Sequence, residues 1–410
     1  MTGLLDDPSH RAWLDAHGDE LVSFAQASVR PDGGFTWLDE HGRPDPDRSV
    51  HMWVTARMTH VFALAAMRGD DGAAALADHG VAALTGLLRD SEYDGWFPAV
   101  EPDGRPTEEP KAAYDHAFVV LAASSAAAAR RPGADVLLRD ALEVMEARFW
   151  SEEEGRCRES WDRAWTILEP YRGANSNMHS VEAFLAAADV TGDDVWRRRA
   201  LSIARHVIET ARTNDWRLIE HFDARWQPDL DYNCDRPDDP FRPYGGTVGH
   251  WLEWARLLLH LEASLADPPP WLLPSAVALF DASVAEGWNV DGEPGFVYTV
   301  DWDGKPVVRT RMHWVLTEAI GAAAALARRT GEDRYATWYA TWWDHARTYF
   351  LDPDRGSWHH ELDPANRPSA TVWQGKPDVY HAYQATLIPQ LPLAPTLAAC
   401  VAAKETARDR

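Results

Sequence analysis

Apolar residues recur along this chain at helical spacing. Four segments carry them at steps of three and four, with charged residues on the opposite side: residues 73–88, 134–149, 194–211 and 334–350. This pattern is typical of helices with one face in solvent. Three other segments are rich in alanine and apolar on nearly every side: residues 117–129, 181–188 and 319–327. The pattern therefore predicts an outer and an inner layer of helices.

Short aromatic-rich stretches separate the helical segments, and each ends in a polar turn and a proline. Six copies, roughly sixty residues apart, end at Pro44, Pro106, Pro170, Pro228, Pro306 and Pro368. Alternating side chains followed by DG, HG or AN turns predict short hairpins or extended loops at these places. Two helical segments usually lie between consecutive copies, so the chain consists of six similar units.

Six such units predict an all-α fold, an (α/α)6 barrel of about twelve helices with short β-hairpins at one end. Closure buries every helix face, whereas an open solenoid, the alternative, would need polar caps at both ends. We expect a single catalytic domain over residues 1–410. Residues 229–241, a loop rich in Pro and Asp in the longest interval, are expected to lie over one mouth of the barrel.

A histidine stands near the start of each expected inner helix: His51, His116, His179, His250, His313 and His381. Because the hairpins share one end of the barrel, the helix starts converge there, and we expect their polar side chains to line a single cavity. One histidine among the 17 of this chain is more often a structural or surface residue. The prediction therefore rests on the convergence of the set.

Helical spacing adds companions to these histidines, because residues three, four or seven apart share a helix face. The pairs and rows are Trp53 with Arg57, Asn175 and Glu182 with His179, Glu253 with His250, Glu318 with Trp314, and Asp378 with His381. Glu182 and Glu253 are expected to fix histidine tautomers instead of carrying protons. For Arg57, an ion pair between helices and substrate binding remain equal alternatives.

Composition narrows the partners of such a pocket. The net charge of −24 repels phosphate backbones and anionic lipids, so neither nucleic acid nor a membrane is expected as a partner. Three scattered cysteines and an acidic first segment without an apolar run favour a soluble protein of the cytoplasm. The 21 tryptophans offer flat faces for sugar rings, although more than half are expected to pack between helices. Whether the chain is a monomer or a homo-oligomer stays open.

Motifs for other chemistries are missing from the sequence. There is no HExxH, no paired CxxC, and the six histidines start six different helices, so we expect no metal and no cofactor. Neither GxxxxGK[ST] nor GxSxG is present. Phosphoryl transfer and serine hydrolysis are therefore not supported.

Five segments carry a resemblance to a known family: WVTARMTHV (53–61), YRGANSNMHSVEAF (171–184), RPYGGTVGHWLEW (242–254), YTVDWDGKPVV (298–308) and DVYHAY (378–383). They resemble the N-acylglucosamine 2-epimerase superfamily, closest to its aldose-ketose isomerase branch with D-mannose and sulfoquinovose isomerases. The resemblance runs from about Trp13 to Pro395 and implies a metal-free enzyme on an (α/α)6 barrel. A free monosaccharide is the implied substrate.

The resemblance also implies residue roles. His250 and His381 match the acid/base pair of the family, and His179 matches a third pocket histidine. We assign the proton on C2 to His381, and ring opening and C1 to His250. The remaining pocket residues are expected to bind the sugar: Trp53, Arg57, Tyr114, His116, Asn175, Glu253, Trp314, Glu318 and Asp378.

The choice of sugar rests on two positions. Sulfoquinovose-acting relatives carry an Arg and a Gln near the sulfonate, where this chain has Pro240 and His360. The resemblance therefore favours interconversion of D-mannose and D-fructose through a cis-enediol, with D-lyxose and D-xylulose as a side reaction, unless Arg242 or Arg311 supplies the cation. The alternatives are a sulfoquinovose isomerase, a sugar 2-epimerase, an (α/α)6 glycoside hydrolase or lyase, and a non-catalytic sugar-binding protein.

Overall fold

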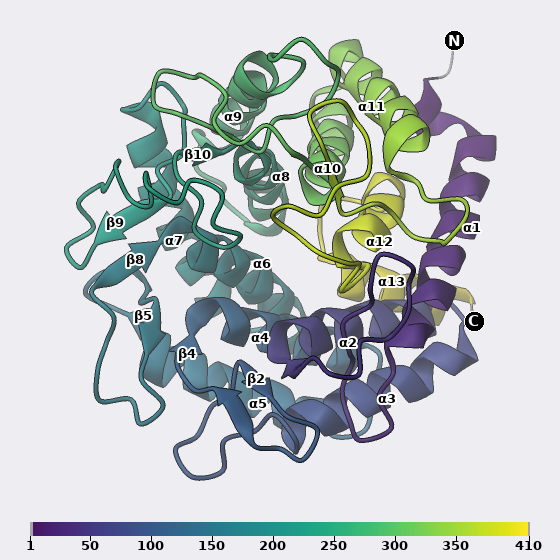
Figure 1. Cartoon of the computed structure of the whole chain (residues 1–410), viewed down its shortest axis with the longest axis vertical. Helices are drawn as coiled ribbons and strands as arrows, with labels where there is room; N and C mark the ends of the chain where they lie inside the picture. Colours follow the sequence, from purple (N-terminus) through teal and green to yellow (C-terminus); the bar gives the residue numbers. More distant parts are fainter. Residues whose placement is uncertain (1–2, 409–410) are drawn as a thin grey trace.

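The computed structural model describes residues 3–408, and in it inner and outer helices alternate around one axis (Figure 1). The inner ring consists of α2 (Met52–Met67), α4 (Ala113–Ala128), α6 (Ala174–Thr191), α8 (Val248–Ser264), α10 (His313–Thr330) and α12 (Tyr380–Leu387). The outer ring consists of α1 (Pro8–Ala25), α3 (Asp71–Thr85), α5 (Ala134–Val144), α7 (Val195–Arg212), α9 (Leu272–Gly287) and α11 (Asp333–His345). Helix α12 contacts both α10 and α2, which closes the inner ring. The expected (α/α)6 barrel is confirmed.

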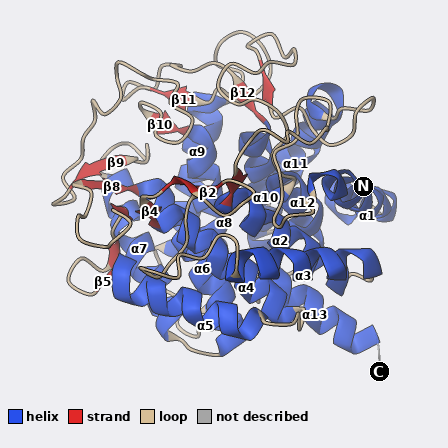
Figure 2. Ribbon diagram, turned by 60° about the horizontal axis from the view of Figure 1, so that its bottom comes forward, coloured by secondary structure: helices blue, strands red, loops and turns tan. Residues whose placement is uncertain are grey.

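A thirteenth helix, α13 (Leu397–Arg408), goes beyond the twelve that the sequence predicts. It contacts α2, α4 and α6 and lies at the end of the barrel away from the hairpins (Figure 2). Short helical turns complete the helical part: η1 (Leu4–Asp6), η2 (Gln26–Ser28), the π-helical turns η3 (Met145–Phe149) and η4 (Ala346–Phe350), and η5 (Ile388–Gln390). None of the described helices combines the length and apolar composition needed to cross a bilayer.

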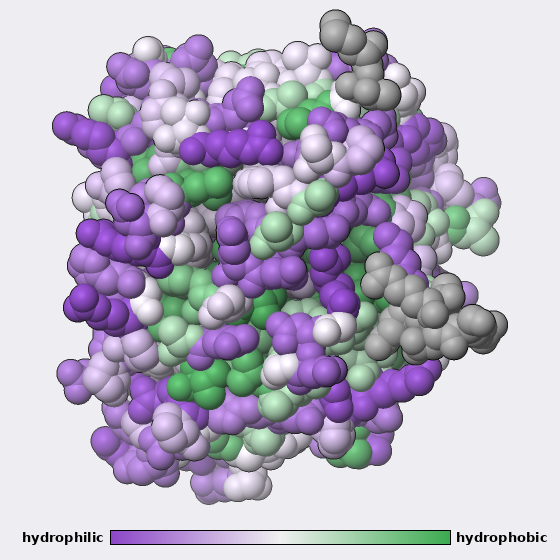
Figure 3. Space-filling view, turned by 90° about the vertical axis from the view of Figure 1, so that its right-hand side faces the viewer, coloured by the Kyte–Doolittle hydropathy of each residue, from purple (hydrophilic) through white to green (hydrophobic). Residues whose placement is uncertain are grey.

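Burial separates the two rings as their sequences predict. Every residue of α2 except Ala66 is buried, and the alanine-rich segments of α4, α6 and α10 are buried between their neighbours. Outer helix α7 buries Trp196, Ile203 and Val207 on one face and turns charged residues outward. Figure 3 shows the resulting exterior on one side of the molecule, where hydrophilic residues surround small hydrophobic patches. Apolar burial, at about 25 cal/mol per Å², holds the layers together.

Six hairpins lie together at one end of the barrel (Figure 2). Each is closed by an antiparallel bridge at or beside the repeated proline: Leu38 with Pro44, Val100 with Pro106, Trp161 with Leu168, Phe222 with Pro228, Val300 with Pro306, and Leu362 with Pro368. Five of the six predicted prolines form the bridge themselves, and Pro170 follows its bridge by two residues. The sixfold repeat is confirmed.

Strand pairs join each repeat to the next. The strand before an inner helix pairs antiparallel with the following hairpin: β1 (Val50–His51) with β2 (Ala99–Val100), β4 (Lys111–Ala112) with β7 (Ser160–Trp161), β8 (Tyr171–Gly173) with β9 (His221–Asp223), β10 (Gly246–Thr247) with β11 (Thr299–Val300), and β12 (Arg311–Met312) with β13 (Glu361–Leu362). Strand β3 (Pro106–Glu108) pairs antiparallel with β2 and adds a third strand to that sheet. Strand β5 (Trp150–Ser151) pairs with β6 (Arg156–Cys157). The N–H of Lys376 donates to the carbonyl of Leu38 at 2.8 Å and joins the last repeat to the first.

The same register caps the inner helices, which lack side-chain N-caps. The first N–H of α6, from Ala174, donates to the carbonyl of Glu220 at 2.9 Å, and the first N–H of α8, from Val248, donates to the carbonyl of Tyr298 at 3.2 Å. Helix α10 follows the same rule, with His313 and His360 at 3.0 Å. Because a free helix N–H in a buried place is costly, these bonds fix each hairpin against a helix start.

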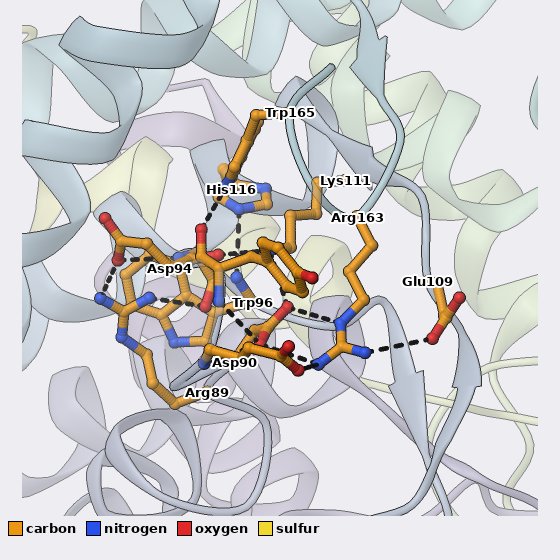
Figure 4. A network of polar contacts seen from close by, with 12 residues as sticks. Arg89, Asp90, Asp94, Trp96, Glu109, Lys111, His116, Arg163 and Trp165 are labelled. Atoms are coloured by element: carbon orange, nitrogen blue, oxygen red, sulfur yellow. Dashed lines mark hydrogen bonds and ion pairs between the residues drawn. The ribbon is translucent and has the colours of Figure 1, made fainter. Parts of the chain in front are cut away.

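Buried ion pairs reinforce the hairpin end, and Figure 4 shows one of them. Lys111 is fully buried and its Nζ lies 2.9 Å from Asp90 Oδ2, which also accepts from Arg163. Two similar pairs join Lys376 to Asp352 and Arg311 to Asp291, each at 2.7 Å. Each pair ties the loop after an outer helix to the segment before the next inner helix.

Candidate active site

A pocket opens at the hairpin end, where the inner helices begin. We call it the inner pocket, and its lining is Trp53, Arg57, Tyr114, Asn175, His179, Pro240, Phe241, His250, Glu253, Tyr298, His313, Trp314, His360, Trp373, Pro377, Asp378 and His381. Ten of the twelve residues expected in the site are among them. The two exceptions are Glu318 and His116.

Two positions of each inner helix account for much of this lining. The second helical residue lines the pocket in five helices, namely Trp53, Tyr114, Asn175, Trp314 and His381. The sixth residue, one turn deeper, lines it in three: Arg57, His179 and Glu253. In α8 the second residue is Gly249, and a Cβ there would lie 2.3 Å from the Trp314 ring. This glycine therefore makes room for Trp314.

His250 is held by a carboxylate that the sequence did not indicate. Its Nδ1–H donates to Glu220 Oε2 at 3.0 Å, and both residues are buried. The other carboxylate oxygen of Glu220 accepts from the N–H of Thr247 at 3.4 Å. A carboxylate on Nδ1 fixes the tautomer and leaves Nε2 free to exchange a proton with a ligand.

His381 has an equivalent anchor. Its Nδ1–H donates to Glu318 Oε1 at 3.1 Å, and Glu318 Oε2 accepts from Arg256 Nε at 2.8 Å. Glu318 therefore supports His381 from below and does not line the inner pocket, because its carboxylate is occupied by these two partners. Burial lowers the pKa of His381, and the bond to Glu318 partly offsets this effect.

Trp314 connects the two anchored histidines. The ring centroid of Trp314 is 5.2 Å from that of His250 and 5.9 Å from that of His381, and both contacts are tilted. Two imidazoles with free Nε2 atoms thus share one aromatic neighbour in one pocket. An open-chain sugar beside Trp314 can contact both.

His179 and two glutamates form the floor. His179 Nδ1 lies 3.6 Å from Glu182 Oε2 and 3.9 Å from Glu253 Oε1. Burial lowers the pKa of His179 to about 4, so this imidazole is neutral at pH 7. Burial, together with the charge of Glu318, raises the pKa of Glu253 well above its ordinary value. Glu182 accepts hydrogen bonds from Tyr380 and Gln384.

These three residues are also the group that could hold a metal ion. Within residues 3–408, no other set of three His, Cys, Asp or Glu side chains meets the same condition, with ligand atoms within 4.8 Å of one another. Glu182 Oε2 is already bonded to Tyr380, and burial raises the pKa of Glu253. Both features work against a metal ion, which needs deprotonated and available carboxylates.

Arg57, on α2, supplies a cation to the wall of the inner pocket. Its guanidinium donates to Asp378 Oδ2 at 3.3 Å and to the Tyr114 hydroxyl at 3.0 Å, and lies 4.3 Å from the Phe118 ring centroid. Burial opposes the charge, but Tyr114 and Asp378 raise the pKa of Arg57 and keep it ionised. Burial also raises the pKa of Tyr114 to about 12. Arg57 therefore makes the ion pair and still faces the pocket.

Two expectations about the histidines are wrong. His116 does not reach the inner pocket: its Nδ1 donates to the carbonyl of Ala112 and its Nε2 accepts from the N–H of Trp96, within the cluster of Figure 4. As the fourth residue of α4 it is rotated by about 200° from the second, and Tyr114 faces the pocket instead. His51 precedes α2 and lines a wider outer cavity.

His313 and His360 form a stacked pair in the pocket wall, with ring centroids 3.8 Å apart. Burial lowers the pKa of His313 to about 3 and that of His360 well below its ordinary value. Both rings are therefore neutral at pH 7. They offer hydrogen bonds to a ligand but no positive charge.

The loop before α8 covers the pocket mouth, as expected. Pro240 and Phe241 line the inner pocket, and the Phe241 ring contacts Trp53, Tyr114 and Trp373 at centroid distances of 5.2–6.3 Å. Arg242 anchors the loop with two bonds to the Glu169 carboxylate, at 2.7 and 3.0 Å.

The cations that could have served a sulfonate are occupied. Arg242 is bonded to Glu169, and Arg311 is buried in its pair with Asp291. In the described part of the chain, Arg57 is the one Lys or Arg that lines the inner pocket.

Comparison with known proteins shows which family the chain belongs to. The model of the N-acylglucosamine 2-epimerase family matches residues 33–385. A D-mannose isomerase of Thermobifida fusca is 62% identical over 396 residues, covering 96% of this chain and 97% of the relative, and one of Pseudomonas cannabina pv. alisalensis is 54% identical, covering 97% of each. A crystal structure of a D-mannose isomerase, 28% identical, superposes with a TM-score of 0.87 and covers 94% of this chain and 99% of its own. The chain belongs to the N-acylglucosamine 2-epimerase family.

Proposed function

We propose that this protein is an aldose-ketose isomerase that interconverts D-mannose and D-fructose. The observation that carries the proposal is the pair His250 and His381, which line one pocket, contact the same Trp314 ring and are each held at Nδ1 by a buried carboxylate. The names of the two relatives at 62% and 54% identity support the choice of sugar.

In the proposed reaction the ring-opened aldose lies with C1 and C2 between the two imidazoles. His381 removes the proton from C2 while His250, which also assists ring opening, acts as an imidazolium and donates the proton on its Nε2 to O1, and a cis-enediol forms. His381 then gives its proton to C1 while His250 takes the proton of O2, which gives the ketose without net gain or loss of atoms and restores both histidines. An imidazole, with an ordinary pKa of about 6.5, can carry protons in both directions near pH 7, and each such transfer contributes roughly 10²- to 10⁴-fold.

Other pocket residues orient the sugar and stabilise charge. Arg57 faces the pocket as a cation and would stabilise negative charge on O1 or O2 as the enediol forms. Glu253, whose pKa is raised by burial, would exchange a hydrogen bond with a sugar oxygen. Trp53 and Trp314 offer flat faces to the carbon chain.

The proposed reaction needs no metal ion, because imidazoles carry every proton. The group of His179, Glu182 and Glu253 fits a metal poorly, since burial raises the pKa of Glu253 and Glu182 is bonded to Tyr380. Dialysis against EDTA should leave the rate unchanged at a metal content well below one ion per chain. A loss of activity that a divalent cation restores would contradict this part of the proposal.

A neutral sugar suits the pocket better than an anionic one. Arg57 is engaged by Asp378, and the His313–His360 pair is neutral. A phosphate or sulfonate would therefore find no unpaired cation among the described lining residues. We expect turnover of D-mannose and D-lyxose, and none of sulfoquinovose.

The experiment is incubation with D-mannose followed by chromatography of the products. Fructose is expected, with a fall in kcat of roughly 10²- to 10⁴-fold in His250→Gln and in His381→Gln, and no change in His41→Gln, an exposed histidine of the first hairpin. Circular dichroism of each variant checks that the fold is retained.

Four outcomes would reject the proposal in favour of an alternative. Glucose without fructose would indicate a 2-epimerase, and turnover of sulfoquinovose alone would indicate the sulfonate-specific isomerase. Cleavage of a neutral oligosaccharide with free mannose untouched would indicate a hydrolase or lyase. Binding of mannose without any product, unchanged in both histidine variants, would indicate a sugar-binding protein.

A further inference from the structure

One arginine lies beneath the inner pocket and touches two of the residues that build it. Arg256 is on α8, three residues after Glu253, so it lies about one turn farther from the pocket and beside Glu253 on the helix surface. Its side chain is buried and does not line the inner pocket. Its Nε donates to Glu318 Oε2 at 2.8 Å, and its second terminal nitrogen lies 3.6 Å from Glu253 Oε1.

Arg256 is the cation of a cluster that is otherwise acidic. Glu182, Glu253 and Glu318 are all buried at or below the pocket floor. In the described part of the chain, Arg256 is the one Lys or Arg that forms an ion pair with any of the three. A buried carboxylate without a partner takes up a proton. Against burial, His179 and Arg256 hold the pKa of Glu182 below its ordinary value, so the position of the one cation distinguishes Glu318 from Glu253.

The guanidinium of Arg256 lies next to Glu318, the glutamate that holds His381. Burial opposes ionisation of Glu318, but the charge of Arg256 and the bond from His381 lower its pKa below the ordinary value. Glu253, farther from the guanidinium, has a raised pKa. On the facing helix, a Cβ on Gly321 would come within 3.1 Å of Arg256 Cδ, so the arginine fills a close-packed space.

We propose that Arg256 is a positioning residue for the isomerisation: by keeping Glu318 a carboxylate, it fixes the proton of His381 on Nδ1 and leaves Nε2 free to face the sugar. The inference rests on the proposed function for its catalytic consequence. The tautomer of the His381 ring can be measured without turnover, so failure of this inference can be told apart from failure of the proposed function.

The test uses Arg256→Met in the full chain, with Arg329→Met as a matched control. Arg329 forms the same kind of pair with Glu262, but on the exterior. In Arg256→Met we expect kcat to fall about 10- to 100-fold, the effect of losing a hydrogen bond to a charged group. The KM for D-mannose should stay within about three-fold, because Arg256 does not touch the pocket. The control should match the parent protein.

The pH profile gives a readout that a merely structural role would not move. Without Arg256, Glu318 protonates more readily and no longer offsets the effect of burial on His381, so the acid limb of kcat/KM should move to lower pH. The other titratable groups that face His381 are Arg57 from α2, His179 from α6, Asp378 and Tyr380 beside it, and the pair of His313 from α10 and His360. All of them are unchanged in the variant.

The decisive measurement is ¹⁵N NMR of the His381 ring, assigned by its loss in His381→Gln. The parent protein should show the Nδ1–H form, and Arg256→Met should show a mixture of tautomers. Should Arg256→Met not fold, Arg256→Gln, which keeps an N–H but no charge, takes its place with the same expected results. An unchanged tautomer in the folded variant overturns the proposal, whatever the rate. If the tautomer shifts but the parent protein does not turn over mannose, the positioning role stands and the proposed function fails.

Discussion

The bond between Glu220 and His250 allows a direct test of how the pocket is built. Glu220→Gln keeps the size and shape of the side chain but replaces a carboxylate, which only accepts, by an amide that can also donate. The bond is 3.0 Å long, both partners are buried, and His250 Nδ1 has no other hydrogen-bond partner in the described structure. Hydrogen bonds to charged groups contribute about 1.5–3 kcal/mol, so kcat/KM for D-mannose should fall about 10- to 150-fold.

The assay is steady-state formation of fructose from mannose by Glu220→Gln, with Glu262→Gln as the matched control. Glu262 is also bonded to a partner, Arg329, but lies in the last turn of α8, at the end of the helix away from the pocket, and the control should differ from the parent by less than two-fold. Thermal unfolding of both variants shows whether the fold is kept. If folded Glu220→Gln retains more than half of the parent kcat/KM, the carboxylate does not set the state of His250, and the reasoning fails.

Two further predictions concern stability and packing. Lys111→Met removes the buried partner of Asp90 and should lower the free energy of unfolding by about 3 kcal/mol, the lower end for a broken buried pair because Arg163 still bonds Asp90. Burial would raise the pKa of Asp90, but Arg163 and Lys111 hold it well below its ordinary value. The loss of unfolding free energy in Lys111→Met should therefore be full above about pH 4 and shrink as the pH falls further. Urea unfolding at several pH values can check this. Gly249→Ala places a Cβ within 2.3 Å of Trp314 and should cost about 1–3 kcal/mol, with at least a ten-fold fall in kcat/KM measured beside Tm; an unchanged Tm and rate would contradict the packing argument.

Helical spacing and the repeated prolines were sufficient to predict the barrel, because both follow from local chemistry. An inner helix must be apolar on every side, and a hairpin must end in a turn. Helix α13 was not predicted, because it follows the last repeat and matches no other unit. Trp53, Trp314 and Trp373 line the inner pocket. More than half of the other tryptophans are buried, but several of these, such as Trp37, Trp96 and Trp165, lie in the hairpins and loops and not on helices.

Histidines near helix starts predicted the place of the pocket but not which side chains reach it. One residue along a helix is a rotation of about 100°, so His116, two residues after Tyr114, points away from the inner pocket. Counting from the hairpins to the second and sixth helical residues would have selected eight of the lining side chains, although not His250, the third residue of α8. Glu220 and Arg256 could not be found in this way, because their contacts join segments distant in the sequence.

The anchoring bonds explain why the pocket depends on the closed barrel. Glu220 accepts from the first N–H of α6 through its carbonyl and from His250 of α8 through its carboxylate. Glu318 of α10 holds His381 of α12, and Arg256 of α8 holds Glu318. Every histidine that we assign to proton transfer is therefore oriented by a residue outside its own helix. A shift of one repeat against its neighbour would disturb tautomers before it exposed any core, so activity should be lost at lower denaturant concentration than helical structure.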